Sequence, residues 1–208
     1  MRRRMIAAAL LVSAAAPSLA TAQHFTTGGK LTSVSAPVRL DTAGVFLSRI
    51  ARVGDDIFVG GQPTEQGLRE MRAQGVTTVV NLRVPEEMTR SVKFDEPALA
   101  AQLGMQYINL PSGGSAKYPY SPETVTKFAE AVRGAKGKVL LHCTVGWRAS
   151  HLWAAYLIAE RGVPVDDALA NARAINLGDI NPQMSGRQPV EEFLNRSLPT
   201  LGHPPGAP

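Results

Sequence analysis

The 208-residue sequence contains a single cysteine, Cys143, and this scarcity excludes an internal disulfide. A lone thiol in an oxidising compartment is a liability unless it is buried or has a chemical task. The ordinary role of a free cysteine is that of a small buried apolar residue. The residues around Cys143 must therefore distinguish a packing role of the thiol from a chemical one.

Other hallmarks of specialised proteins are also missing. Beyond Arg2, Arg3 and Arg4, the sequence has no run of Lys and Arg and no basic patch interleaved with aromatics. Without Arg2, Arg3 and Arg4, the Lys and Arg fall from 22 to 19 against 17 Asp and Glu, a net charge of +2 that gives no case for nucleic acid. The four scattered histidines have no metal-ligand spacing, and no glycine-rich nucleotide loop occurs, so we predict no metal and no cofactor.

Residues 1–22 have the pattern of a secretory signal peptide. Three arginines precede a short apolar run from Met5 to Ala16, and Ala20-Thr21-Ala22 supplies the small residues of a cleavage site. The apolar run is short for a bilayer span, and no second stretch of membrane length follows. We therefore expect cleavage after Ala22 and export, to a bacterial periplasm, with no membrane attachment after cleavage.

Strand and helix signals alternate along residues 51–200, which we interpret as one domain. Residues 23–50 read as a loose lead-in and residues 201–208 as a disordered tail. Short apolar and β-branched runs predict strands over 57–59, 76–82, 105–110 and 138–142. Caps and stop signals predict helices from Thr64 to Gly75, over 95–103, from Ser121, and over 147–161, 165–175 and 190–198.

This alternation predicts a single α/β domain. Its central sheet should be mostly parallel, with about four to five strands and helices on both faces. Ligands in such sheets bind where strands end and helices begin. The edge of the sheet at the carboxyl ends of the strands is therefore where we look for chemistry.

The segment from Cys143 to Arg148 lies at such an edge, between the strand at 138–142 and an apolar helix. The free N–H groups and the dipole at a helix N-terminus favour a thiolate at Cys143 over the neutral thiol. Gly146 allows a tight turn that aims backbone N–H groups at an oxyanion. Arg148 offers a planar fork of donors for a tetrahedral anion. We predict an anion-binding loop in which Thr144, Val145, Gly146 and Trp147 supply the backbone.

The pattern His142-Cys143-x-x-Gly146-x-Arg148 after a strand resembles the signature of the protein tyrosine and dual-specificity phosphatase superfamily. Within it, the sequence is most similar to the bacterial beta-lactamase-hydrolase-like family, and segments 58–64 and 75–83 share the resemblance, which covers roughly residues 52–162. The resemblance implies a cysteine-phosphatase-like fold and a phosphorylated or other oxyanionic substrate. It also implies Cys143 as nucleophile and Arg148 as the phosphate-binding arginine, with a phosphocysteine intermediate.

The sequence departs from the phosphatase pattern in two places. Four residues separate Cys143 from Arg148 instead of five, and Ala149 rather than a hydroxyl residue follows the arginine, which leaves Ser150 and His142 as candidates for tuning the thiolate. The loop at 111–118, where such phosphatases carry an acidic proton donor, has no Asp or Glu. Substitutes from other loops are Glu86, Glu87 and Asp95.

Three functions fit these residues. The preferred one is a cysteine-dependent phosphatase-like hydrolase of phosphate esters. The short loop also fits a rhodanese-like sulfurtransferase that carries a persulfide on Cys143, and a degenerate module that binds an oxyanion without turnover is the third. For Arg83, at the same sheet edge, a solvent-exposed ion pair with Glu86 or Glu87 is the expected role.

Overall fold

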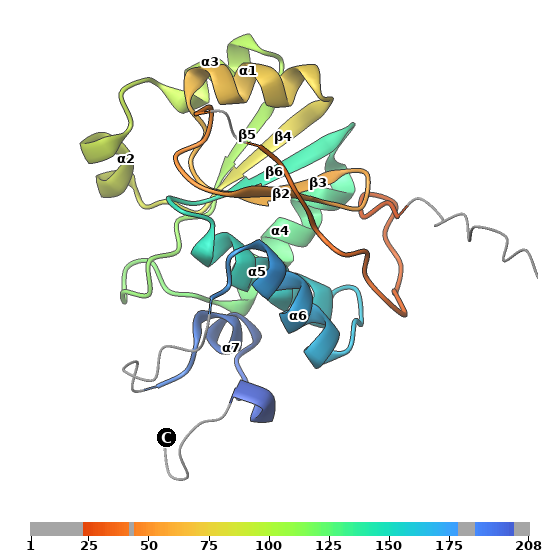
Figure 1. The fold of residues 1–208 in the computed structure, drawn as a ribbon. Coiled ribbons are helices and arrows are strands. Elements are labelled where there is room, and N and C mark those ends of the chain that lie inside the picture. Colours follow the sequence, from red (N-terminus) through yellow and green to blue (C-terminus); the bar gives the residue numbers. More distant parts are fainter. Residues whose placement is uncertain (1–22, 42–43, 179–185, 202–208) are drawn as a thin grey trace, which may run out of the picture.

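A six-stranded sheet organises the chain in the computed structural model, which describes residues 23–41, 44–178 and 186–201 (Figure 1). The strands are β1 (Val38–Arg39), β2 (Ile50–Val53), β3 (Ile57–Gly60), β4 (Val76–Asn81), β5 (Gln106–Asn109) and β6 (Lys138–His142). The helices are α1 (Glu65–Ala73), α2 (Pro85–Ser91), α3 (Glu96–Gln102), α4 (Pro122–Gly134), α5 (Trp147–Ala159), α6 (Val165–Ile175), α7 (Pro189–Leu194) and a 3₁₀ turn, η1 (Pro199–Leu201). The proposed signal peptide and residues 202–208 of the proposed tail lie outside the described residues.

Strand β6 lies in the interior of the sheet, whose order is β1-β2-β3-β6-β4-β5. It pairs in parallel with β3 and β4, and Leu141 of β6 is in register with Val59 and Val80. Strand β5 extends the parallel part, whereas β2 and β1 add an antiparallel edge. The parallel strands β3, β6 and β4 therefore all end at the same edge, where Cys143 follows β6.

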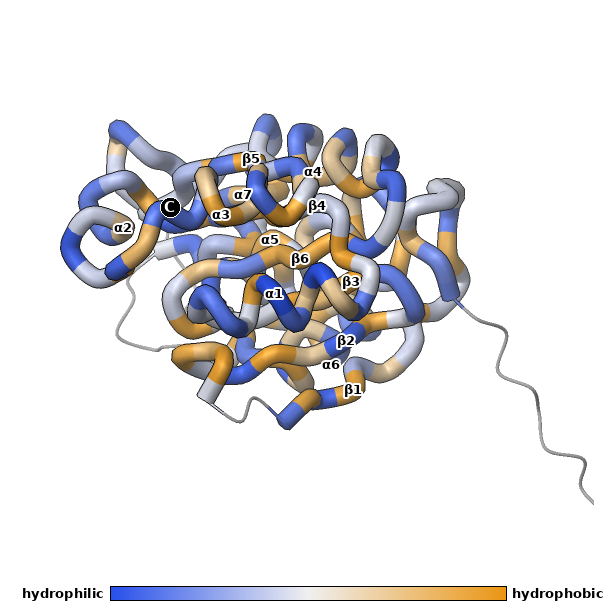
Figure 2. The backbone as a smooth tube through the Cα atoms, turned by 90° about the horizontal axis from the view of Figure 1, so that it is seen from above, coloured by the Kyte–Doolittle hydropathy of each residue, from blue (hydrophilic) through white to orange (hydrophobic). Residues whose placement is uncertain are grey.

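Helices cover both faces of the sheet, as the sequence predicted (Figure 1). On one face α1 and α3 pack on Phe58, Val79 and Leu140, because alternate side chains of a strand point to opposite sides. On the other face α4, α5, α6 and α7 bury the larger core, which includes Val139 and Leu141. Hydrophobic colouring runs along β6, whereas α1 alternates between hydrophilic and hydrophobic (Figure 2). No helix of the described residues is long and apolar enough to span a bilayer.

The segment that precedes the sheet packs firmly on the domain, which corrects the expectation of a loose lead-in. Phe25 is buried and meets the Trp153 ring edge-on, with centroids 5.0 Å apart. The Asp56 carboxylate accepts the Phe25 N–H at 2.9 Å, and the Arg161 guanidinium donates to three carbonyl oxygens of this segment. Because these contacts satisfy backbone groups without a sheet or helix, hydrophobic periodicity did not reveal them.

The predicted elements match the structure well in position. Strand β6 and helix α6 have the predicted bounds, and Thr64 caps α1 by accepting the Gly67 N–H at 3.1 Å. Helix α7 ends earlier than predicted because Asn195 adopts a left-handed conformation, with φ 50°. Four elements were missed: β1, β2, α2 and the 3₁₀ turn η1.

Candidate active site

The loop after β6 is held by the strands and loops around it. The Cys143 N–H donates to the Gly60 carbonyl at 3.2 Å, and the Gln62 N–H donates to the Thr144 carbonyl at 3.0 Å. The Val145 carbonyl accepts from Ser48 Oγ at 3.2 Å and from Asn176 Nδ2 at 2.6 Å. Carbonyl groups of the loop are thus engaged on its outer side. The Cys143 side chain is buried at the base of the loop.

Gly146 makes the turn from this loop into α5. It is the N-cap of the helix and has φ 86°, a left-handed conformation that glycine adopts without strain. A Cβ at this position would lie 3.1 Å from the Gly60 carbonyl carbon. The Ser150 hydroxyl donates to the Gly146 carbonyl at 2.8 Å. The Ser150 hydroxyl therefore donates its hydrogen bond to the loop backbone and not to the thiol.

Arg148 lies in the first turn of α5, and its side chain extends back to the loop. Its Nη1 donates to the Ser112 carbonyl at 2.9 Å, and its Nη2 contacts both carboxylate oxygens of Glu87, at 3.0 and 2.8 Å. Nη2 also lies 3.2 Å from Thr144 Oγ1. Burial alone would lower the pKa of Arg148, but Glu87 and Cys143 raise it above its ordinary value. The guanidinium is therefore charged and fixed beside the cysteine.

Arg83 is buried, which corrects the expectation of a solvent-exposed ion pair. Its Nη1 donates to Gln62 Oε1 at 2.7 Å, and its Nη2 donates to the Glu87 carbonyl and to the Ser91 hydroxyl. Its Nε lies 3.8 Å from the Glu87 carboxylate. Burial lowers the pKa of Arg83 despite the opposing influence of Glu87. The Glu87 carboxylate thus lies between two arginines, Arg83 and Arg148.

His142 points to the face of the sheet opposite to the one that Cys143 joins. Its Nε2 lies 3.0 Å from Glu96 Oε1, and Gln62 Nε2 donates to the other Glu96 oxygen at 2.9 Å. Burial alone would raise the pKa of Glu96, yet His142, Gln62 and Arg83 lower it overall. The structure therefore links His142 to Arg83 through side chains, a connection that the sequence did not predict.

The loop from Pro111 to Tyr120 covers Arg148 without offering an acid. Its Lys117 pairs with Glu86 at 3.0 Å, and Tyr118 Oη donates to the same carboxylate at 3.4 Å. The Tyr120 ring meets Phe193 edge-on, at 5.1 Å between centroids. Burial raises the pKa of the Tyr120 hydroxyl. Both tyrosines therefore have packing or anchoring partners at the rim of the site.

Trp147 and His151 form a pair at the start of α5. Their rings meet edge-on with centroids 4.6 Å apart. Trp147 is half-buried at the loop, whereas His151 is buried and its pKa is lowered to about 3 by burial. His151 is thus a neutral packing residue, and Trp147 retains surface at the loop, where Val145 is 46% exposed.

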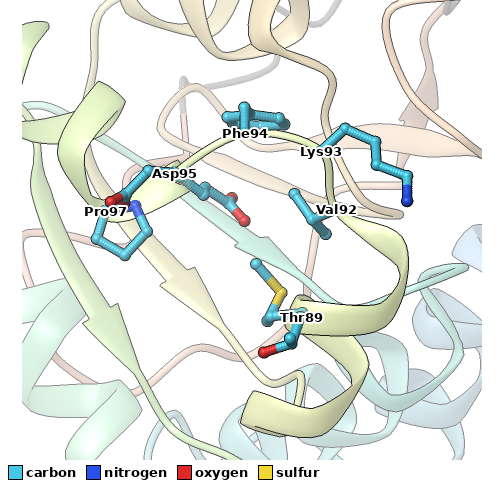
Figure 3. Close-up of a pocket in the computed structure, with 8 residues that line it drawn as sticks. Thr89, Val92, Lys93, Phe94, Asp95 and Pro97 are labelled. Carbon is cyan, nitrogen blue, oxygen red and sulfur yellow. The ribbon is translucent and has the colours of Figure 1, made fainter.

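The linker between α2 and α3 borders a hollow of about 440 Å³ on the far side of α2 (Figure 3). Its lining includes Met88 and Thr89 of α2 and continues along the linker from Val92 to the start of α3. Asp95 caps α3 by accepting the Ala98 N–H at 2.9 Å. This role occupies Asp95 away from the loop of Cys143. Within the described residues no cluster of His, Cys, Asp and Glu could hold a metal ion.

Comparisons with known proteins agree with this geometry. The model of a family described as "DSP-PTPase phosphatase fused to NAD+ Kinase" matches residues 51–186. The "Beta-lactamase hydrolase-like protein" of Xylella fastidiosa strain 9a5c is 27% identical over 133 residues, which are 62% of this chain. The chain spans 30% of the length of that relative.

Solved structures share the fold. A crystal structure named "Putative phosphatase (DUF442)", from Shewanella putrefaciens CN-32, has a TM-score of 0.53 and 26% identity, and covers 68% of this chain and 88% of its own. P. aeruginosa TpbA in complex with pTyr has a TM-score of 0.50 and 19% identity, over 68% of this chain and 78% of its own. The predicted cysteine-phosphatase-like fold is confirmed.

Proposed function

The chain belongs to the DSP-PTPase family that is described as fused to NAD+ kinase, and on that premise we propose that it hydrolyses phosphate esters through a phosphocysteine intermediate on Cys143. The family and the structural neighbours are phosphatases, which supports a phosphatase-type function. One observation carries the finer proposal. Cys143 and Arg148 meet at a single loop, and the guanidinium is anchored by Ser112 and Glu87.

This anchoring leaves Nε of Arg148 to a phosphate, which would share or take Nη2 from its present partners. The structure engages Nη1 of Arg148 with Ser112, and Nη2 with Glu87 and Thr144, while Nε makes no hydrogen bond among the described residues. Nε and one N–H of Nη2 point along one edge of the planar guanidinium, the geometry for two oxygens of one phosphate. The backbone N–H groups of Thr144 to Trp147 complete the cradle at the start of α5.

The reaction then proceeds in two displacements at phosphorus. The Cys143 thiolate attacks phosphorus, an S–P bond forms, and the bond to the ester oxygen breaks. Water next attacks the phosphocysteine, which releases phosphate and restores the thiolate. Arg148 and the loop N–H groups stabilise the charge on the equatorial oxygens in both transition states.

The substrate that we propose is an aryl phosphate such as phosphotyrosine. The support is the pTyr complex of TpbA, which shares the fold, and the half-buried Trp147 beside the exposed Val145 at the loop. An aromatic side chain at the rim would pack on the ring of such a substrate. We further propose that the protein acts after export, on the basis of the signal-like residues 1–22.

Sulfur transfer is the competing chemistry for a loop with four residues between cysteine and arginine. The comparisons with phosphatases do not favour it. It has its own readout, because thiosulfate would leave a mass increase of one sulfur on Cys143. An oxyanion-binding module would bind phosphate, lose that binding in Arg148→Ala, and show no turnover.

The test is hydrolysis of p-nitrophenyl phosphate under reducing conditions. We expect turnover that disappears in Cys143→Ser and falls roughly 10²–10³-fold in Arg148→Ala, the usual cost of one donor to the transition-state charge. Arg133→Ala, on the exposed side of α4, is the matched control and should keep full activity. Equal rates for the wild type and Cys143→Ser would sink the proposal.

A further inference from the structure

One role in this reaction has no residue in the cradle. When the bond between phosphorus and the ester oxygen breaks, that oxygen departs as an anion unless an acid protonates it. Cys143 reacts as the thiolate, and Arg148 stays charged throughout. Ser112, which lies over Arg148, is buried and its hydroxyl donates to the Leu110 carbonyl at 3.0 Å. The proton has to come from another element.

Four acids of α2 and the start of α3 lie near this end of the sheet, and their contacts separate them. Glu192 of α7 interacts electrostatically with Tyr120 at the rim. Glu96 is fully buried against His142, and Asp95 caps α3. Glu86 is held by Lys117 at the exposed rim. Glu87 is the one whose carboxylate reaches the cradle, through the Arg148 nitrogen that also contacts Thr144. Its side chain is 28% exposed, so it can exchange a proton with solvent.

The charges that face Glu87 change when a phosphate binds. In the unliganded protein, the Glu87 carboxylate faces Nη2 of Arg148 at 2.8 Å and Nε of Arg83 at 3.8 Å. Cys143 and Tyr120 also interact electrostatically with Arg148, and Tyr120 with Glu87. A bound phosphate takes the hydrogen bonds of Arg148 and places negative charge next to Glu87. Negative charge within about 4–6 Å disfavours a second anion, so binding drives proton uptake.

We propose, on the basis of the phosphatase function above, that Glu87 protonates the leaving group. As Cys143 Sγ attacks and the S–P bond forms, the Glu87 proton passes to the ester oxygen, which leaves as the neutral alcohol or phenol. Glu87 is then a carboxylate, and it accepts a proton from the water that attacks the phosphocysteine. Breakage of the S–P bond returns the thiolate and leaves Glu87 protonated for the next turnover.

Helix α2 holds Glu87 in a defined position and can itself shift. Glu87 is the third residue of the helix, and its Oε2 accepts the N–H of the N-cap residue Val84 at 3.3 Å, which is one half of a capping box. None of the seven described residues of α2 is buried. A hollow lined by Met88 and Thr89 opens beside the helix (Figure 3). A small shift of α2 can therefore carry Glu87 from Arg148 toward the ester oxygen without uncovering a core.

The test compares leaving groups in Glu87→Gln. A proton donor matters for phenyl phosphate, whose leaving phenol is a very weak acid, and matters less for p-nitrophenyl phosphate, whose leaving p-nitrophenol is a stronger acid. We expect kcat/KM for phenyl phosphate to fall roughly 10²–10⁴-fold, with a far smaller loss for p-nitrophenyl phosphate.

Three further variants make the outcome decisive. Glu86→Gln is the matched control one position earlier in α2, and should keep the wild-type ratio between the two substrates. Glu87→Asp, which keeps a carboxyl group, should retain part of the activity on phenyl phosphate. An equal loss of activity on both substrates in Glu87→Gln would overturn the proposal and indicate that Glu87 only positions Arg148. If Tyr120→Phe, and not Glu87→Gln, lost activity mainly on phenyl phosphate, the proton donor would be Tyr120. If neither substrate is turned over in a Cys143-dependent way, the phosphatase proposal itself fails.

Discussion

The Glu96 carboxylate lies 3.0 Å from Nε2 of His142, and neither side chain has exposed surface. Gln62 bridges this pair to Arg83, whose guanidinium donates to the Glu87 carbonyl. A line of polar side chains therefore runs beneath the site from the residue before the cysteine to the residue that contacts Arg148. Buried polar groups of this kind are costly to leave unpaired, so every member restrains its neighbours.

Glu96→Ala should lower the free energy of unfolding by about 3–5 kcal/mol at neutral pH, the cost of breaking a buried pair. Because folding lowers the pKa of Glu96, its stabilisation is complete above the unfolded-state value of about 4.3 and is lost as pH falls through the lower folded-state value. Urea unfolding of both proteins at a series of pH values checks this. A difference that stays constant into acid would contradict it, and Glu123→Ala, at an exposed position, should change little.

His151 should make the free energy of unfolding decrease as the pH is lowered, in a different pH window. Burial lowers its pKa to about 3, so below roughly pH 6.5 the unfolded chain binds a proton that the folded chain does not. The free energy of unfolding should drop by about 1.4 kcal/mol per pH unit between these values from this group alone. His151→Leu should remove that slope, whereas His24→Gln, at an exposed site, should keep it. Identical slopes in all three proteins would refute the assignment.

Gly146→Ala should reduce both stability and turnover. The left-handed conformation costs a non-glycine residue about 1–2 kcal/mol, and the added Cβ would press on Gly60. Gly134→Ala, at the end of α4 with open space around it, should instead stabilise the protein by about 0.4–1 kcal/mol. Thermal unfolding and p-nitrophenyl phosphate hydrolysis of the two variants distinguish conformational strain at Gly146 from a general effect of added methyl groups.

Arg161→Ala should release the segment that carries Phe25. The guanidinium donates to three carbonyls of that segment and to Tyr156 Oη, and hydrogen bonds to a charged group are worth about 1.5–3 kcal/mol. Limited proteolysis should then cleave near residues 23–31 before the rest of the domain. Arg133→Ala removes a comparable charge from an exposed pair and should leave the cleavage pattern unchanged.

The parts of the fold that bury apolar side chains were predictable from the sequence. Strand β6 and helix α6 were placed at their observed bounds because an apolar run or a periodic face defines each of them. Helix α2 has no such face, since none of its described residues is buried, and it follows a strand without any hydrophobic signal. Strands β1 and β2 are short and end in the antiparallel edge, so they gave little alternation to detect.

The site likewise has a part that could be predicted from the sequence and a part that could not. The loop from Cys143 to Arg148 is local in sequence, and its chemistry could be read from residue types alone. The contact between Glu87 and Arg148 joins residues 61 positions apart, and no local pattern encodes it. Arg83 was misplaced because charged residues are ordinarily exposed. The polar residues Asn81 and Gln62 around the sheet edge were the available hint that a buried charge would find partners there.

Helix α2 has a consequence for how the protein opens. No side chain of α2 is fully buried, so detachment of the helix exposes little core surface and should depend only weakly on denaturant. Amides of α2 should therefore exchange with solvent deuterium through a local fluctuation that denaturant changes little, while amides of β6 exchange only on global unfolding. Added phosphate should slow this exchange if Glu87 stays near the bound anion, and should speed it if Glu87 loses its contact with Arg148. Exchange in α2 therefore reports whether the loop is occupied.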